Sequence, residues 1–182
     1  MAHSVAASDS KKWTSIPRKF TMIFVTVGTD HAFDRLMKAV DKWAANHGRH
    51  DLYAQIGHDG WEPTFIPFCN MMPHAEVLDH IRSSSLVISH AGMGTILTAL
   101  HFQKSILVMP KLATLGEHRN EHQTATCRKL QALPGVNVAF DDHELIDRLN
   151  HAESLTKPSC EREFSDEVFL MKIRKFIFCD EI

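Results

Sequence analysis

The sequence predicts an α/β fold in which one parallel sheet carries helices on both faces. Short apolar runs, typical of buried strands, alternate along the chain with segments whose apolar residues recur every three or four positions. Strict alternation of strands and helices is typical of right-handed βαβ units. The 182 residues, of which 44% are hydrophobic, suffice for one compact core and are too few for two full-sized domains.

The N-terminal elements are a strand, a helix and two further strands. Residues 22–27 form a nearly uninterrupted apolar run, as in a strand that is buried on both faces. Residues 32–47 form a helix because their apolar members share one helical face. Strands follow at 51–56 and, after the turn-rich segment 57–60, at 64–68.

The middle of the chain holds a helix, a strand, a second helix and another strand. Pro73 suits the first turn of a helix that ends at the serines 83–85. Strands at 86–88 and 105–109 flank the second helix, at 94–103. In the helix that begins near Pro73, we expect the apolar stripe to consist of Ala75, Leu78 and Ile81.

The C-terminal part of the domain contributes two helices and one strand. The helices are expected at 119–133 and 142–151, and the strand between them at 136–140. This last strand completes the alternating pattern and therefore the parallel sheet.

Two terminal segments flank the expected domain, which spans residues 20–157. Residues 1–19 lack any periodicity and predict a flexible tail. Residues 158–182 contain a further helix, at 166–178, with apolar residues on one side. That side packs either on the domain or on a partner.

Composition excludes several classes of protein. A net charge of −2 leaves no broad basic surface, so we expect no nucleic-acid partner. The chain has neither a run of 18 apolar residues nor a signal-peptide core, which predicts a cytoplasmic protein. Four cysteines without a C-x-x-C pair indicate neither a disulfide framework nor a zinc knuckle.

A glycine-rich turn, Ser-His-Ala-Gly-Met-Gly-Thr at residues 89–95, joins a strand to a helix. Glycines let a ligand approach the backbone closely, and the N–H groups at the start of a helix attract anions. The motif therefore predicts a phosphate site from Gly92 to Thr95. The alternative is that the glycines only let the strand and the helix pack closely.

The pattern of motifs resembles a known family of glycosyltransferases. The matching segments are residues 25–29, 33–36, 90–100 and 116–123. They are similar to the nucleotide-sugar-binding half of MurG-type enzymes, the glycosyltransferase family 28 C-terminal domain. The resemblance is greatest to single-domain versions: the eukaryotic subunit that adds N-acetylglucosamine to a dolichol-linked sugar and, more closely, bacterial exopolysaccharide subunits of the glucuronosyltransferase type.

This resemblance implies a fold, a reaction and a partner. The fold would be the Rossmann-like, donor-binding half of a GT-B glycosyltransferase. The reaction would be an inverting transfer of a hexose-type sugar from a UDP-sugar to a lipid-linked saccharide, without a metal ion or other cofactor, in polysaccharide biosynthesis. The partner would be a membrane-anchored subunit that binds the acceptor and recruits this chain to the cytoplasmic face of a membrane as a heterodimer.

The resemblance also assigns binding residues by position. The backbone and hydroxyl groups that it places on the diphosphate are those of Gly28, Thr29, Gly92, Met93, Gly94 and Thr95. The residues that it places around the uridine are Phe68, Cys69, His90 and Thr98. The residues that it places on the sugar are Glu117, Asn120, His122 and Gln123.

Two parts of the expected site depart from this pattern. Relatives often carry a glutamate where this chain has Thr98, and one hydroxyl cannot accept both ribose hydroxyls as a carboxylate can. Glu117 on the neighbouring loop is an alternative acceptor. No residue is assigned as the general base: His31 and Asp34 lie beside the first glycine loop, but a solvated His31 is an equally good interpretation.

The sequence leaves the sugar and the chemistry open in three respects. If the sugar is glucuronate, its carboxylate requires a cation, for which Arg119 and Lys111 are nearest in sequence. A non-catalytic UDP-sugar-binding or regulatory protein of the same fold is an alternative function. A zinc hydrolase is a remote one, because the segment 118–122 fits the H-x-x-E-H pattern with His118, Glu121 and His122, provided that both histidines share one helical face.

Overall fold

Six parallel strands form one sheet in the order β3-β2-β1-β4-β5-β6. The computed structural model describes residues 22–158. Its strands are β1 (Ile23–Thr26), β2 (Leu52–Gln55), β3 (Phe68–Cys69), β4 (Leu86–His90), β5 (Ser105–Met109) and β6 (Val136–Val138). Its α-helices are α1 (Asp34–Asn46), α2 (His74–Ser83), α3 (Met93–His101), α4 (His122–Leu130) and α5 (Asp142–Asn150). The predicted α/β fold with a parallel sheet is confirmed.

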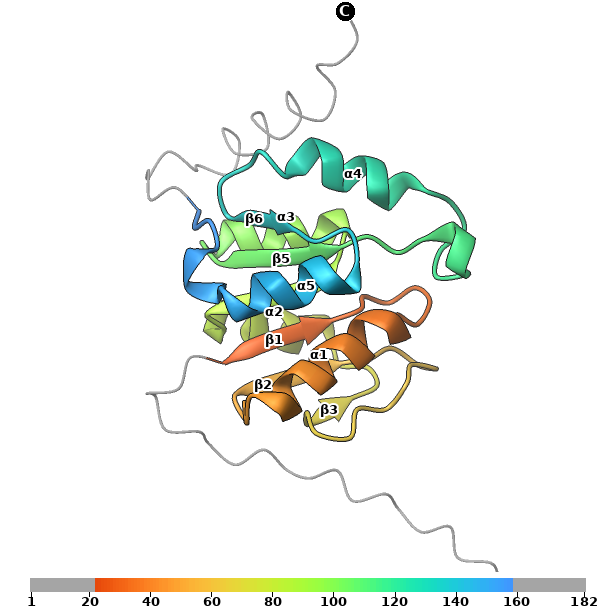
Figure 1. Cartoon of the computed structure of the whole chain (residues 1–182), viewed down its shortest axis with the longest axis vertical. Helices are drawn as coiled ribbons and strands as arrows, with labels where there is room; N and C mark the ends of the chain where they lie inside the picture. The colour runs from red at the N-terminus through yellow and green to blue at the C-terminus, as the bar shows by residue number, and fades with distance from the viewer. Residues whose placement is uncertain (1–21, 159–182) are drawn as a thin grey trace, which may run out of the picture.

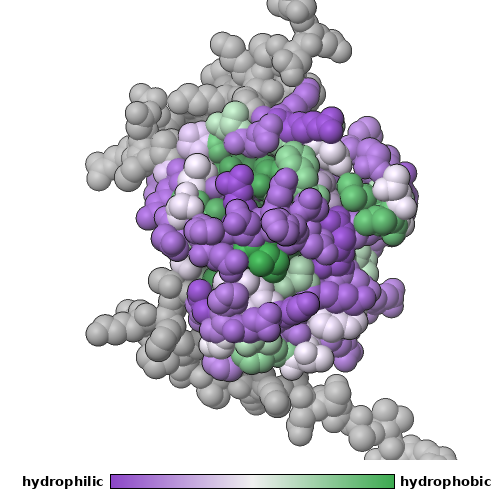
Figure 2. Space-filling view, in the orientation of Figure 1, coloured by the Kyte–Doolittle hydropathy of each residue, from purple (hydrophilic) through white to green (hydrophobic). Residues whose placement is uncertain are grey.

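Helices cover both faces of this sheet (Figure 1). Successive residues of a strand point to opposite faces, so Val25 packs with α1 and α5 while Phe24 packs with α2, α3 and α4. The two resulting apolar clusters are the two halves of the core. Figure 2 shows that the outer surface on the α1 and α5 side is mainly hydrophilic, as expected for amphipathic helices that bury one face.

The strand order places a crevice at the centre of the sheet. From β1 the chain moves outward to β2 and β3, then returns to β4 on the other side of β1 and continues outward to β5 and β6. The loops that follow β1 and β4 therefore diverge at the carboxyl edge of the sheet. In open α/β sheets this reversal of strand order is where ligands bind.

The third strand is two residues long and lies later in the chain than the sequence predicts. The expected strand at 64–68 is absent because the buried Asp41 carboxylate on α1 accepts hydrogen bonds from the backbone N–H groups of Thr64, Phe65 and Ile66 at 2.8–3.1 Å. These N–H groups are thereby unavailable to a neighbouring strand. Pairing with β2 begins only at Phe68.

Two helices also differ from the sequence prediction. Helix α4 begins at His122 rather than at residue 119, because residues 117–121 form bends. In α2, Ala75 is exposed and only Ile81 of the expected apolar stripe is fully buried. The predicted N-terminal tail and the predicted helix at 166–178 lie outside the described residues.

None of the helices within residues 22–158 combines the length and the apolar character that crossing a membrane requires.

Replacing Asp41 by alanine should destabilise the fold. The variant removes the acceptor for the Thr64 hydroxyl and for three backbone N–H groups. One of these N–H groups belongs to the buried Ile66. We expect Asp41→Ala to lower the free energy of unfolding by about 2–3 kcal/mol in urea denaturation. The control is Asp79→Ala, an exposed aspartate on α2, which should change it by less than about 0.5 kcal/mol. Equal effects of the two variants would contradict this role of Asp41.

Candidate active site

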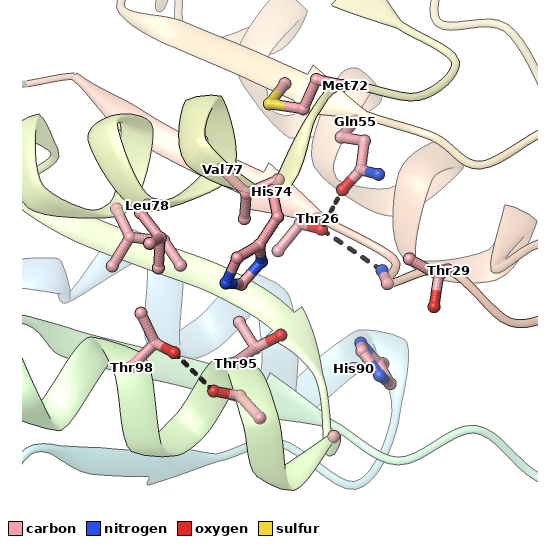
Figure 3. Close-up of a pocket in the computed structure, with 14 residues that line it drawn as sticks. Thr26, Thr29, Gln55, Met72, His74, Val77, Leu78, His90, Thr95 and Thr98 are labelled. Carbon is pink, nitrogen blue, oxygen red and sulfur yellow. Dashed lines mark hydrogen bonds between the residues drawn. The ribbon is translucent and has the colours of Figure 1, made fainter.

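A pocket of about 390 Å³ opens at the crevice between the ends of β1 and β4. Its walls come from the loop after β1, the glycine loop after β4, and helices α2 and α3 (Figure 3). Seven of the predicted ligand-binding residues line it: Gly28, Thr29, His90, Gly92, Gly94, Thr95 and Thr98. The fold thus brings both glycine loops to one site.

Two of these glycines are required by a neighbouring side chain. The His90 imidazole lies between the two loops, and a Cβ atom added to either Gly28 or Gly92 would overlap the ring. Gly28 also has a φ of +79°, a left-handed conformation that favours glycine. At these two positions a contact within the protein, with the His90 ring, explains the absence of a side chain.

Gly94 differs from both of them. A Cβ atom added there would meet no protein atom within 4 Å, so no internal contact explains why this residue lacks a side chain. It is the second residue of α3, whose N-terminus has no side-chain cap, and it lines the pocket. The N–H groups of this first turn have no carbonyl four residues earlier in the helix to bond, and they carry the positive end of the helix dipole. This geometry suits an anion in the pocket.

The His90 imidazole is neutral at physiological pH. Burial, with a smaller contribution from the charge of Lys111, lowers the pKa of His90 to about 4. Its Nδ1 lies 3.2 Å from the Ser89 hydroxyl. The ring lies against Gly28 and Gly92 and lines the pocket beside the two glycine loops.

Lys111, immediately after β5 and Pro110, fixes the loop that follows β1. The side chain is buried, and its ammonium group donates to the backbone carbonyls of Val27, Asp30 and His31 at 2.5–3.1 Å. Burial lowers the pKa of Lys111 to about 8, although nearby carboxylates oppose the shift. Because the three ammonium hydrogens are used inside the protein, Lys111 is not placed to pair with a ligand carboxylate.

Glu117 and Gln123 are also held by protein partners. The Glu117 carboxylate accepts both Nε and Nη2 of Arg35 at 2.9 Å and the backbone N–H of Leu112 at 2.9 Å. Its side chain is only 11% exposed. The Gln123 Oε1 atom accepts the backbone N–H of Lys111 at 3.0 Å. Neither residue lines the pocket.

The other two residues predicted to bind the sugar are exposed on the loop between β5 and α4. Asn120 accepts the backbone N–H of His122 through Oδ1 at 3.2 Å, in a turn that begins α4. His122 is the first residue of this helix. The β5–α4 loop faces the loop after β1, because the rings of His31 and His118 lie 6.3 Å apart.

Among the residues predicted to bind uridine, Thr98 lines the pocket and Phe68 and Cys69 do not. The Thr98 hydroxyl donates to the Gly94 carbonyl at 2.7 Å, within its own helix (Figure 3). Phe68 and Cys69 form β3, and the Cys69 carbonyl accepts the N–H of Ile56 at 3.0 Å. Burial raises the pKa of the Cys69 thiol. Met93, predicted to bind the diphosphate, does not line the pocket.

Sequence reasoning missed half of the pocket. The additional lining residues are Thr26, Gln55, Met72, His74, Val77, Leu78 and Ile81. Thr26 and Gln55 are the last residues of β1 and β2, so the rule that ligands bind beyond the carboxyl ends of strands could have marked them. The apolar residues of α2 read as an ordinary core stripe in the sequence.

A polar group at the base of the pocket shapes the first glycine loop. The Thr26 hydroxyl donates to Gln55 Oε1 at 2.6 Å and accepts the Gly28 N–H at 3.2 Å, while Gln55 donates to the Met71 sulfur at 3.3 Å. In Figure 3 the His74 imidazole reaches from α2 toward Thr95 on α3.

The geometric premise of the zinc alternative is wrong. Helix α4 begins at His122, so His118 lies in the preceding bend and the two histidines do not share a helical face. Within residues 22–158, no group of three or more His, Cys, Asp or Glu side chains is arranged to hold a metal ion.

Several solved structures share this fold. The chain is similar to the solution structure of ALG13, with 21% identity and a TM-score of 0.53, over 76% of this chain and 88% of that one. It is also similar to CalG4, the calicheamicin glycosyltransferase (12%, 0.56, 91% and 40%), and to Os79 from O. sativa in complex with UDP (16%, 0.55, 89% and 36%). The chain spans less than half the length of CalG4 and Os79. At these identities the likeness is one of fold: the Rossmann-like C-terminal half of a GT-B glycosyltransferase.

Sequence similarity to a family supplies the class of protein. Residues 22–159, three quarters of the chain, match the family model described as the glycosyltransferase family 28 C-terminal domain. The match contains every element of the sheet and both glycine loops. The chain therefore belongs to the glycosyltransferase family 28 C-terminal domain family.

Proposed function

We propose that this chain is the donor-binding, catalytic subunit of an inverting glycosyltransferase. It takes a hexose-type sugar from a UDP-sugar and transfers it to a lipid-linked saccharide in polysaccharide biosynthesis. The observation that carries this proposal is the uncapped N-terminus of α3, where Gly94 leaves open space at the wall of a pocket. Membership of a glycosyltransferase family supports the diphosphate of a nucleotide sugar as this anion.

On this proposal the diphosphate lies against the first turn of α3. The N–H groups of Gly94 and Thr95 and the Thr95 hydroxyl bind its oxygens, and Gly28 and Thr29 face it from the loop after β1. Negative charge grows on the diphosphate as UDP leaves, so these donors stabilise the transition state more than the ground state. The helix N-terminus thereby performs the charge stabilisation for which other transferases use a metal ion.

The nucleoside then extends along the groove between α2 and α3. Met72, Val77 and Leu78 supply an apolar wall for the base, and His74 lies at the start of the same helix. His90, beside the glycine loops, contacts the diphosphate end rather than the uridine. Asn120 and His122, exposed on the β5–α4 loop, hydrogen-bond the hydroxyls of the sugar.

The acceptor site belongs to a partner in this proposal. The chain matches the donor-binding half of GT-B structures and spans 40% of CalG4. A membrane-anchored subunit would bind the lipid-linked acceptor and hold this chain at the cytoplasmic face of the membrane. Co-purification with a membrane protein supports this arrangement, whereas full transfer to a lipid acceptor by the isolated chain contradicts it.

A non-catalytic UDP-sugar-binding protein is the second candidate function. It is favoured by Thr98, because a threonine offers no carboxylate at this position to hold the ribose. The Thr98 hydroxyl moreover donates to the Gly94 carbonyl within its own helix. Turnover of a UDP-sugar in the presence of the partner distinguishes the two functions, since the regulatory protein binds the donor and leaves it intact.

Replacing Gly94 by valine should abolish donor binding without unfolding the protein. The valine side chain would occupy the space that the diphosphate needs, yet it would meet no protein atom at Cβ. We expect saturable binding of UDP to the wild-type chain in calorimetric titrations with EDTA present, and no measurable binding to Gly94→Val. The thermal unfolding midpoints should agree within about 3 °C.

The matched control is Ala132→Val, which adds the same bulk at an exposed position away from the pocket. It should bind UDP as the wild type does. Unchanged UDP binding by Gly94→Val would show that the anion does not lie at α3, and a requirement for metal would contradict the proposed mode of binding.

Arg119 is the cation expected to recognise glucuronate, if that is the sugar. It is exposed on the β5–α4 loop, whereas the other candidate, Lys111, is buried and donates its ammonium hydrogens to three backbone carbonyls. Arg119→Ala should weaken binding of UDP-glucuronate by about 1.5–3 kcal/mol more than binding of UDP-glucose, since a charge-assisted hydrogen bond is lost only with the former. Equal losses for the two donors in calorimetry would exclude this contact.

A further inference from the structure

The loop after β1 contains a residue in an unfavourable backbone conformation. His31 has a φ of +36°, in the left-handed region that residues other than glycine seldom adopt. Such conformations persist only where the surroundings enforce them, and they concentrate at functional sites. Here the enforcing group is the buried Lys111 ammonium, which binds the carbonyls of Asp30 and His31.

The side chain of His31 is oriented as well as its backbone. Its Nδ1 atom lies 2.7 Å from an oxygen of the Asp30 carboxylate. Although desolvation by itself raises it, the pKa of Asp30 is lowered overall by His31 and two nearby cations, so this carboxylate is ionised at neutral pH. An ionised carboxylate accepts the hydrogen bond, which assigns the proton of a neutral imidazole to Nδ1 and leaves the lone pair on Nε2, at the opposite edge of the ring.

The position of His31 suits a group that meets the sugar. It lies two residues after Thr29, which lines the pocket, and its side chain is 37% exposed. Its ring faces His118 on the β5–α4 loop at 6.3 Å, and that loop carries Asn120. The residue therefore lies between the loop that carries Thr29 and the loop proposed to bind sugar hydroxyls.

Two other groups near the pocket, Asp34 and His90, are less suited to accept a proton. The Asp34 carboxylate accepts the backbone N–H of Trp61 at 2.9 Å and lies 3.9 Å from the Lys38 ammonium. The His90 ring is enclosed between Gly28 and Gly92. His31 combines exposure with a fixed tautomer.

We propose that His31, oriented by Asp30, is the general base of the transferase. This inference rests on the function proposed above. The Nε2 atom takes the proton from the acceptor hydroxyl while the acceptor oxygen bonds to the anomeric carbon of the sugar. The bond between that carbon and the diphosphate oxygen breaks, and its electron pair leaves with UDP. The proton then passes from His31 to water.

A consequence is that the donor-binding chain itself holds the base. Asp30 is a positioning residue in this scheme, and Lys111 positions both through their carbonyls. The partner then binds and aligns the acceptor saccharide, and it need not supply the general base.

The test compares binding with turnover in His31→Asn. Asparagine tolerates the left-handed conformation, so the loop is retained, but it has no basic nitrogen. The matched control is His143→Asn, on the exposed surface of α5. Calorimetry gives the Kd for the UDP-sugar, and sugar incorporation gives kcat when each protein is added to membranes of the source organism that lack the chain and supply the acceptor and any partner.

We expect His31→Asn to keep the wild-type Kd within about twofold and to lose about 100-fold or more of kcat, the usual contribution of a general base. His143→Asn should match the wild type in both. In His31→Gly, added imidazole should restore part of kcat, which a merely structural histidine would not permit.

Three results would overturn the inference. Retention of more than about a third of kcat by His31→Asn would remove the base while leaving the proposed function intact. A loss of Kd equal to the loss of kcat would make His31 a binding residue. Absence of UDP-sugar binding by the wild type would reject the proposed function itself, and the inference with it.

Discussion

The geometry of the site depends on one buried ammonium group. Lys111 follows β5, two strands away from β1, yet it holds the loop after β1 through three carbonyls. Removing a charge from water is unfavourable, which is why burial lowers its pKa, and the three hydrogen bonds offset that cost. Arg35 on α1 adds a second connection by binding Glu117 and the Pro110 carbonyl, so the β5–α4 loop is anchored to the same part of the molecule. The loop after β1 and the β5–α4 loop are therefore both held in place by contacts within the protein, and such preorganisation lowers the cost of binding a ligand.

The His90 ring explains why Gly92 and Gly94, two glycines of the same motif, differ in their surroundings. His90 fills the space between the loops after β1 and β4, so Gly28 and Gly92 lack side chains because of the protein's own packing. Gly94 lies two residues after Gly92, in the first turn of α3, and has no such neighbour. The structure thus gives the glycines different environments: a protein contact explains Gly28 and Gly92, and none explains Gly94. The neutral state of His90 fits this arrangement, because burial of the ring between two backbone loops removes most of the water that would solvate its charge.

The architecture was predictable from sequence because it depends on local periodicity, and several side-chain roles were not because they depend on distant partners. The apolar runs at β1, β4 and β5 are visible without any knowledge of the fold. The expected strand at 64–68 fails because of Asp41, which is more than 20 positions earlier in the chain. Glu117 and Gln123 have the chemistry of sugar ligands, but Arg35, 82 positions away, and the backbone of Lys111 engage their oxygens. Polar residues after a strand thus predict a site at the sheet edge, and only the tertiary structure separates those that support the loops from those that face the pocket.

Binding of the diphosphate and removal of the acceptor proton require different elements of this fold. A helix N-terminus can stabilise a departing diphosphate, but it cannot remove a proton from the acceptor, so the base must lie on another element that reaches the sugar. Inversion also requires the acceptor to approach on the side of the anomeric carbon opposite to the leaving group. The loops after β1 and β5 leave the same carboxyl edge of the sheet at which α3 begins, and the Lys111 side chain joins them. Lys111 holds the loop that carries both Gly28 and His31, so in the proposed scheme one buried group supports donor binding and acceptor activation together.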